Sequence, residues 1–107
     1  MRAILSALAI LAVAPASAAG DSQEALTRCY ARQAVTLDDG MSDARSIATA
    51  LLAPCRSERE AVLRDGMPKA STTEIERAML MQREIVLDRA TAVVLQVRID
   101  QKKRRQP

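Results

Sequence analysis

Two cysteines, Cys29 and Cys55, are the side chains with the clearest chemical potential in this 107-residue chain. In an oxidising compartment an even pair predicts a disulfide, which adds about 3.5 kcal/mol to stability by restricting the unfolded chain. A redox-active or metal-binding thiol pair is the alternative interpretation. Against it, the sequence has no Cys-x-x-Cys motif, no histidine and no third cysteine to complete a zinc site. We therefore favour a structural disulfide between Cys29 and Cys55.

The remaining side chains offer little catalytic chemistry. The absence of histidine excludes His-based catalytic triads and His-containing metal sites. Asp38 and Asp39 stand directly before Gly40, where turn formation explains them better than acid–base catalysis. The acidic run 38–43 lacks the ligand spacing of an EF-hand, and the sequence has no phosphate loop or dinucleotide fingerprint. We therefore predict a protein that is not an enzyme and that has no metal or cofactor.

Residues 102–107 form a basic tail with three possible roles. It can be a solvated helix end whose cations favour the negative end of the helix dipole, a contact for anionic lipid headgroups, or a nucleic-acid contact. The charges lack interleaved aromatic residues, which favours the first role, and we expect no nucleic-acid partner. The four charged residues are Lys102, Lys103, Arg104 and Arg105.

Residues 1–19 have the three-part layout of a secretory signal peptide. A short basic start precedes the apolar run 3–13, and small residues follow it. That run is shorter than the roughly 20 residues of a spanning helix, which favours cleavage after Ala18 or Ala19 over a membrane anchor. No cysteine directly follows the apolar run, so we expect no lipid anchor. The prediction is an exported protein, periplasmic or secreted.

The domain that must position the cysteines spans residues 20–101 and has helical patterning throughout. Apolar residues recur at helical spacing in three segments, 22–37, 42–65 and 74–101. Their predicted N-caps are Asp21 or Ser22, Ser42 and Thr73. The third segment carries a long apolar stripe with a shoulder beside it. The stripe is Ile75, Met79, Gln82, Val86, Ala90, Val93 and Val97, and the shoulder is Ala78, Met81, Ile85 and Ala92.

Two of these segments allow a second interpretation. Pro54 removes a backbone hydrogen bond inside 42–65, and a capping box at 57–60 can start a new helix. We favour one kinked helix, because the apolar stripe keeps its phase across the proline. Residues 93–99 also alternate as a strand would. No second strand is evident to pair with them, so we favour helix.

The expected fold is therefore all-α: a disulfide-stapled helical hairpin plus a long third helix, preceded by a cleaved signal peptide. The stripe of the third helix continues through Val93 and Val97, beyond the reach of a first helix that ends near residue 37. Uncovered apolar surface of this kind usually marks an interface. We expect Val93, Val97 and the basic tail to contact a protein partner or a second copy of the chain.

The pattern between residues 24 and 65 resembles small exported bacterial helical proteins of uncharacterised function. The resemblance rests on Leu37–Gly40, Ser42–Ala44, Ile47–Ala48 and Cys55, with Cys29 upstream. It implies export and a helical fold, but no activity. The sequence thus predicts a non-catalytic interaction module: an adaptor, inhibitor or accessory subunit. The alternative is a peripheral membrane or envelope-stress protein that uses the third helix and the basic tail.

Overall fold

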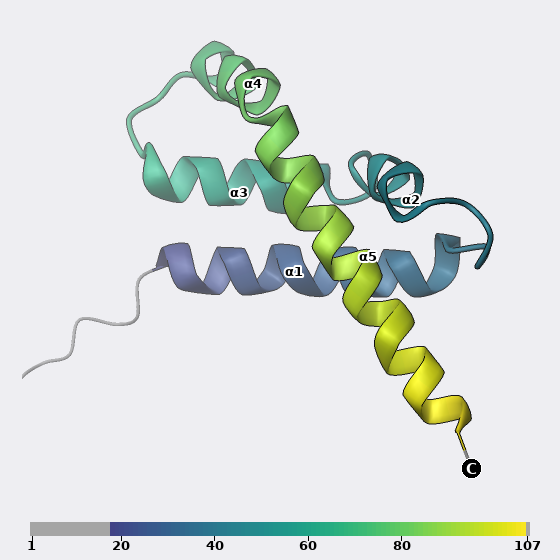
Figure 1. Ribbon diagram of the computed structural model, residues 1–107. Helices are drawn as coiled ribbons and strands as arrows, with labels where there is room; N and C mark the ends of the chain where they lie inside the picture. Colours follow the sequence, from purple (N-terminus) through teal and green to yellow (C-terminus); the bar gives the residue numbers. More distant parts are fainter. Residues whose placement is uncertain (1–17, 107) are drawn as a thin grey trace, which may run out of the picture.

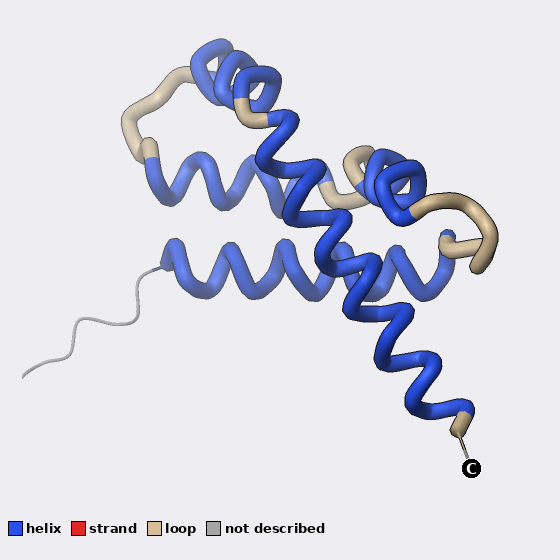
Figure 2. Tube along the Cα trace, in the orientation of Figure 1, coloured by secondary structure: helices blue, strands red, loops and turns tan. Residues whose placement is uncertain are grey.

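The computed structural model describes residues 18–106, which form helices joined by short loops, with no strand among them (Figures 1 and 2). The all-helical prediction is confirmed for this part of the chain. The predicted signal peptide, 1–19, lies outside the described residues except for Ala18 and Ala19, which begin the first helix. The helices are α1 (Ala18–Leu37), α2 (Ala44–Leu51), α3 (Arg56–Gly66), α4 (Thr72–Met81) and α5 (Arg83–Arg105).

The loop after α1 forms where the sequence predicted a helix stop. Gly40 has a φ of 71°, a left-handed conformation that glycine adopts without steric cost. The Asp38 carboxylate accepts from the Gly40 N–H at 3.0 Å. The Asp39 carboxylate accepts from the Ser42 N–H at 2.7 Å and from the Ser42 hydroxyl at 2.6 Å. These side-chain bonds replace the backbone bonds that the helix gives up, as is typical of Asp-rich turns.

Residues 42–65 form two helices, so the prediction of one kinked helix is wrong. The helix α2 ends at Leu51, a turn follows, and α3 begins at Arg56. Pro54 explains the break, because it has no N–H to donate and its ring opposes the carbonyl of the residue four before it. The N-cap of α2 is also one residue later than predicted. Asp43, not Ser42, accepts from the Ser46 N–H at 2.8 Å.

The predicted third helix is likewise divided, at Gln82 between α4 and α5. Its cap is Ser71 rather than Thr73, and Ser71 forms a reciprocal capping box with Glu74. Gln82 has φ −95° and ψ 7°, outside regular helical geometry, yet its carbonyl still accepts from the Val86 N–H at 3.0 Å. The bend therefore keeps its hydrogen bonds, which allows a change of direction without glycine or proline. Residues 93–99 are helical as predicted.

Packing of the helices is centred on α1. Figure 1 shows α3 running antiparallel beside α1 and α5 crossing α1, and α5 also packs against α2. The hydrophobic core lies where α1, α2 and α5 meet, and α3 contributes no fully buried side chain to it. The members of this core are Leu26, Cys29, Tyr30, Ala34, Ile47, Ala48, Leu51, Cys55, Ala90 and Val94.

A half-buried ion pair fixes the far half of α5 to the loop after α1. The guanidinium of Arg98 donates to both carboxylate oxygens of Asp38, at 2.7 and 2.8 Å, and to the Ser42 carbonyl at 2.6 Å. The Asp38 side chain is only 5% exposed, so little water competes for it. Such bidentate, charge-assisted bonds are among the stronger polar interactions in proteins. Arg45 makes a more exposed bridge to Glu84 and Asp88, which contributes less.

The carboxylates of this loop make stability sensitive to acid. Hydrogen bonds from Arg98 lower the pKa of Asp38, and hydrogen bonds from Ser42 lower the pKa of Asp39 to about 2. Both values lie below the roughly 3.9 of an aspartate in the unfolded chain. The unfolded state therefore binds protons first as the pH falls. The stabilisation from these groups is complete above about pH 4 and is lost as the pH falls toward 2.

We accordingly expect acid unfolding between about pH 4 and 2 that is weaker in the double variant Asp38→Asn, Asp39→Asn. At pH 7 the single change Asp38→Asn should lower the free energy of unfolding by about 1–2 kcal/mol, because Arg98 loses a charged partner while remaining partly solvated. Urea unfolding followed by circular dichroism at several pH values measures both effects. An acid transition of the same size in the double variant would contradict this account.

Candidate interaction surface

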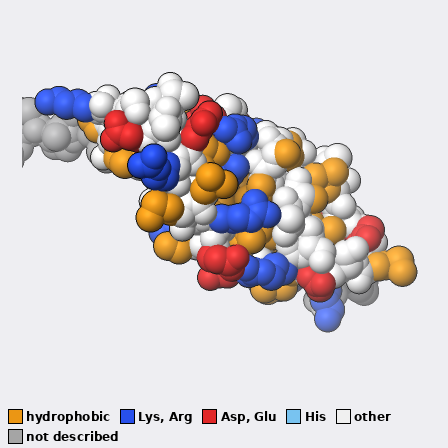
Figure 3. Space-filling model, turned by 90° about the horizontal axis from the view of Figure 1, so that it is seen from above, with side chains coloured by type: hydrophobic (Ala, Val, Ile, Leu, Met, Phe, Trp, Pro, Cys, Tyr) orange, Lys and Arg blue, Asp and Glu red, His pale blue; other side chains and the backbone are white. Residues whose placement is uncertain are grey.

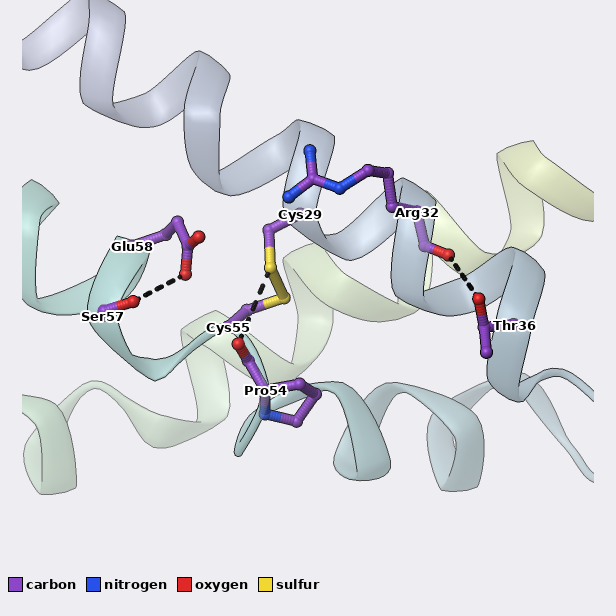
Figure 4. The surroundings of a disulfide bond; sticks show 7 residues. All are labelled: Cys29, Arg32, Thr36, Pro54, Cys55, Ser57 and Glu58. Atoms are coloured by element: carbon purple, nitrogen blue, oxygen red, sulfur yellow. Dashed lines mark hydrogen bonds between the residues drawn. A yellow bond between two sulfur atoms is a disulfide. The ribbon is translucent and has the colours of Figure 1, made fainter.

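The disulfide between Cys29 and Cys55 is present, as predicted, and it links α1 to the residue that precedes α3 (Figure 4). The two Cα atoms are 5.9 Å apart. Both cysteines are buried, with exposed fractions of 2% and 0%. The Cys29 sulfur lies 3.9 Å from the Pro54 carbonyl oxygen, a van der Waals contact because a bridged sulfur carries no proton. A bond enclosed in the core is shielded from attacking thiolates, which fits a structural role.

Val93 and Val97 are not the uncovered residues that the sequence predicted. Both are partly buried and pack against the core cluster, and Val94 between them is fully buried. The reason is that α5 crosses α1 and α2, so its far half is covered without any need for a longer first helix. The apolar side chains that α5 exposes in this half are Leu95 and Ile99, at 48% and 49%.

The four cations of the basic tail lie in the last turn of α5, and all four are exposed. Cations at this end interact favourably with the helix dipole. Lys102 and Arg105 also line an open groove between α5 and the loop after α1, together with Val35. Ile99 lies four residues after Leu95, and Lys102 and Lys103 lie three and four residues after Ile99, so the four residues share one side of α5. We call these four residues the tail face.

A second apolar surface, which the sequence analysis did not single out, lies at the joint between α4 and α5. Leu80, Met81 and Ile85 are exposed to 75%, 79% and 56%, although Met81 and Ile85 belong to the predicted buried shoulder. We call these three residues the joint patch. A single continuous helix would have turned the shoulder toward the core. The bend at Gln82 instead changes the orientation of α4 relative to α5, and no residue type at that position signals it.

An apolar cavity of about 80 Å³ opens beside the joint patch. It exists because α3 packs against α1 and α4 but not against α5. Its apolar walls come from four helices, and Ile85 belongs to both the cavity and the joint patch. Two guanidinium groups, of Arg59 and Arg89, complete the lining together with two glutamines. The apolar lining residues are Leu26, Val62, Leu63, Met79, Ile85 and Val86.

The surface around the cavity is positively charged. Arg59, Arg83 and Arg89 form no ion pair among the described residues, whereas Arg56 pairs with Glu60 at 3.1 Å. Burial lowers the pKa of Arg59, and the neighbouring charges of Arg56 and Arg83 lower it further. Figure 3, which looks from above Figure 1, shows hydrophobic side chains lying among Lys and Arg side chains, with Asp and Glu side chains on the same face. An anionic group is the electrostatic complement of such a surface.

Other classes of site were sought within residues 18–106. No three His, Cys, Asp or Glu side chains in this range come together as metal ligands. None of its helices combines the length and the hydropathy needed to cross a membrane. Comparison of the chain with protein-family models, with curated proteins and with solved structures gave no match.

Proposed function

We propose that this protein is an exported, disulfide-stapled, non-catalytic module that binds a protein partner through the joint patch. The observation that carries the proposal is the exposure of Leu80, Met81 and Ile85, each more than half accessible to solvent and all within residues 80–85. Large apolar side chains exposed together within one short segment are typical of an interaction site. The signal-peptide pattern of residues 1–19 and the disulfide support export.

The side chains of the joint patch also suit binding in detail. Leucine and isoleucine provide apolar area, and methionine adapts its shape to a partner because its side chain is unbranched and polarisable. The unpaired arginines Arg59 and Arg83 lie close by, across a shared surface groove that Leu80 also lines. A partner with apolar side chains would cover the joint patch, and acidic side chains around them would pair with the two arginines. We therefore infer that the partner surface is acidic at its rim.

Site-specific photocrosslinking tests this proposal. A photoreactive residue at position 80 or 81 should give one discrete crosslinked protein in cells that export the chain, because these side chains sit at the centre of the interface. The matched control is position 61, an exposed alanine of α3. With the captured partner purified, Leu80→Glu with Ile85→Glu should weaken its binding at least tenfold, since central apolar contacts dominate interface energies.

Two results would count against the joint patch as the interface. One is equal crosslinking from position 61 and from positions 80 and 81. The other is unchanged affinity of the double variant for the purified partner. Circular dichroism of the double variant should match that of the wild type, because both substituted side chains are already largely solvated.

A second candidate function, peripheral attachment to a membrane surface, is favoured by the tail face. Its half-exposed Leu95 and Ile99 precede Lys102 and Lys103 on one side of α5. Apolar side chains beside lysines are the combination that binds anionic headgroups at an interface. Co-sedimentation with vesicles that contain anionic lipid, weakening as salt is added, would favour this function over a protein partner at the joint patch.

A further inference from the structure

Two buried polar side-chain atoms among the described residues have no hydrogen-bond partner, and one of them belongs to Arg59, which lines the cavity. They are the hydroxyl oxygen of Tyr30 and the Nε of Arg59. Tyr30 is only 2% exposed, and a polar group buried without a partner carries a desolvation cost of about 1–3 kcal/mol. Native structures rarely leave such groups unsatisfied, and the exceptions call for a functional explanation.

The electrostatic surroundings link these atoms to the cavity. Burial raises the pKa of Tyr30, while the positive charges of Arg59 and Arg89 act in the opposite direction. The Tyr30 hydroxyl therefore lies within electrostatic reach of both arginines that line the cavity. The cavity lining contains no aspartate or glutamate among the described residues. Two cations thus line one apolar space, and no carboxylate of the described residues stands in that lining.

We propose that the cavity between α3 and α5 binds an aliphatic carboxylate, a small amphiphilic anion of the fatty-acid type. The carboxylate accepts a hydrogen bond from Arg59, which lines the cavity, and is further attracted by Arg89. The alkyl chain lies against the apolar walls and leaves the cavity past Ile85. This site does not depend on a protein partner at the joint patch, because every group that it uses belongs to this chain and faces the cavity or lies beside it.

The size of the cavity limits the part of the ligand that it encloses. A dry cavity of about 150 Å³ holds a benzene molecule. The roughly 80 Å³ available here therefore encloses about half as much, a segment of a few carbon atoms. A longer chain would continue across the exposed face of Ile85 toward Met81. We therefore expect a chain of medium length, such as that of octanoate, to bind more tightly than acetate.

Tyr30 provides a direct readout, since it is the only aromatic residue of the chain. Octanoate added below its micellar concentration, to oxidised protein purified from cells that express the full chain, should change the tyrosine fluorescence in a saturable way. Arg59→Gln should weaken this binding about tenfold or more, because the charge-assisted hydrogen bonds to the carboxylate are lost. The matched control is Arg64→Gln, an exposed position on the same helix, which should leave it unchanged.

Two further probes, one without the charge and one without the alkyl chain, complete the experiment. Octanol has the same chain without the charge, and inorganic phosphate has charge without a chain. Both should bind at least tenfold more weakly than octanoate. If octanol bound as tightly as octanoate, the carboxylate would not contribute to binding. If phosphate bound as tightly, the apolar walls would not contribute. If octanoate gave no saturable change in fluorescence, the proposed site would not exist. Far-ultraviolet circular dichroism of Arg59→Gln, expected to match the wild type, separates lost binding from lost folding.

Discussion

Replacing Cys29 and Cys55 together by alanine is expected to lower the free energy of unfolding by about 3.5 kcal/mol. The bond closes a loop between residues 26 positions apart, and opening it restores conformational freedom to the unfolded chain. A domain of this size has a total stability of only about 5–15 kcal/mol, so the change removes a large part of it. Urea unfolding of the variant and the oxidised wild type measures the difference.

The loss of stability in the double alanine variant should differ from helix to helix. The helix α3 has no fully buried side chain and packs against α1 and α4 only. Its attachment to the core therefore depends on Cys55 more than that of α5, which buries Leu87, Ala90 and Val94. Amide hydrogen exchange in the double variant should accelerate most in residues 56–66 and least in the middle of α5.

Chemically reduced wild-type protein is the matched control for this experiment, because it keeps both sulfur atoms and loses only the bond. Its free energy of unfolding should lie within about 1 kcal/mol of that of the double alanine variant. The remaining difference reflects the small volume that the alanines remove from the core. If the reduced protein kept the stability of the oxidised protein, the disulfide would not be the element that holds α3 in place.

Local signals in the sequence were sufficient for the all-helical class, for the end of α1 and for the disulfide. Gly40 and the two aspartates before it end α1 because their turn chemistry acts within a few residues. Pro54 also acts locally, and giving more weight to its missing N–H than to the continuous apolar stripe would have predicted the break between α2 and α3. The cysteine pair needed only the oxidising context, since the chain offers a single intramolecular pairing.

The bend at Gln82 had no such local signal. No glycine or proline lies near it, and the apolar stripe continues across it from Met79 to Val86. The sequence pattern places Ile85 in the apolar shoulder and Val93 beyond the reach of the first helix, whereas in the structure Ile85 is 56% exposed and Val93 packs against the core. The cavity is even harder to predict from the sequence than the bend. It forms where the backbones of α3 and α5 stay apart, with no Cα pair of the two helices within 8 Å, and no periodicity within either helix specifies that separation.

The two sides of α5 should therefore respond in opposite ways to added charge. Val93→Glu with Val97→Glu is expected to lower the free energy of unfolding by about 2–4 kcal/mol, because both side chains pack against the core and a carboxylate there loses its water. The matched variant is Leu95→Glu with Ile99→Glu, on side chains that are half exposed. Its stability should change by about 0.5 kcal/mol or less.

The two double variants also distinguish an effect on folding from an effect on membrane binding by the tail face. If α5 binds anionic membranes, Leu95→Glu with Ile99→Glu should abolish co-sedimentation with anionic vesicles while the protein stays folded, because it replaces apolar contacts with repelled charges. Equal stability of the two double variants would mean that Val93 and Val97 are not part of the core. In that case the stripe through these valines would again be the best candidate for an interface. A destabilised Val93, Val97 variant beside a stable Leu95, Ile99 variant leaves the tail face and the joint patch as the surfaces on which partners can bind.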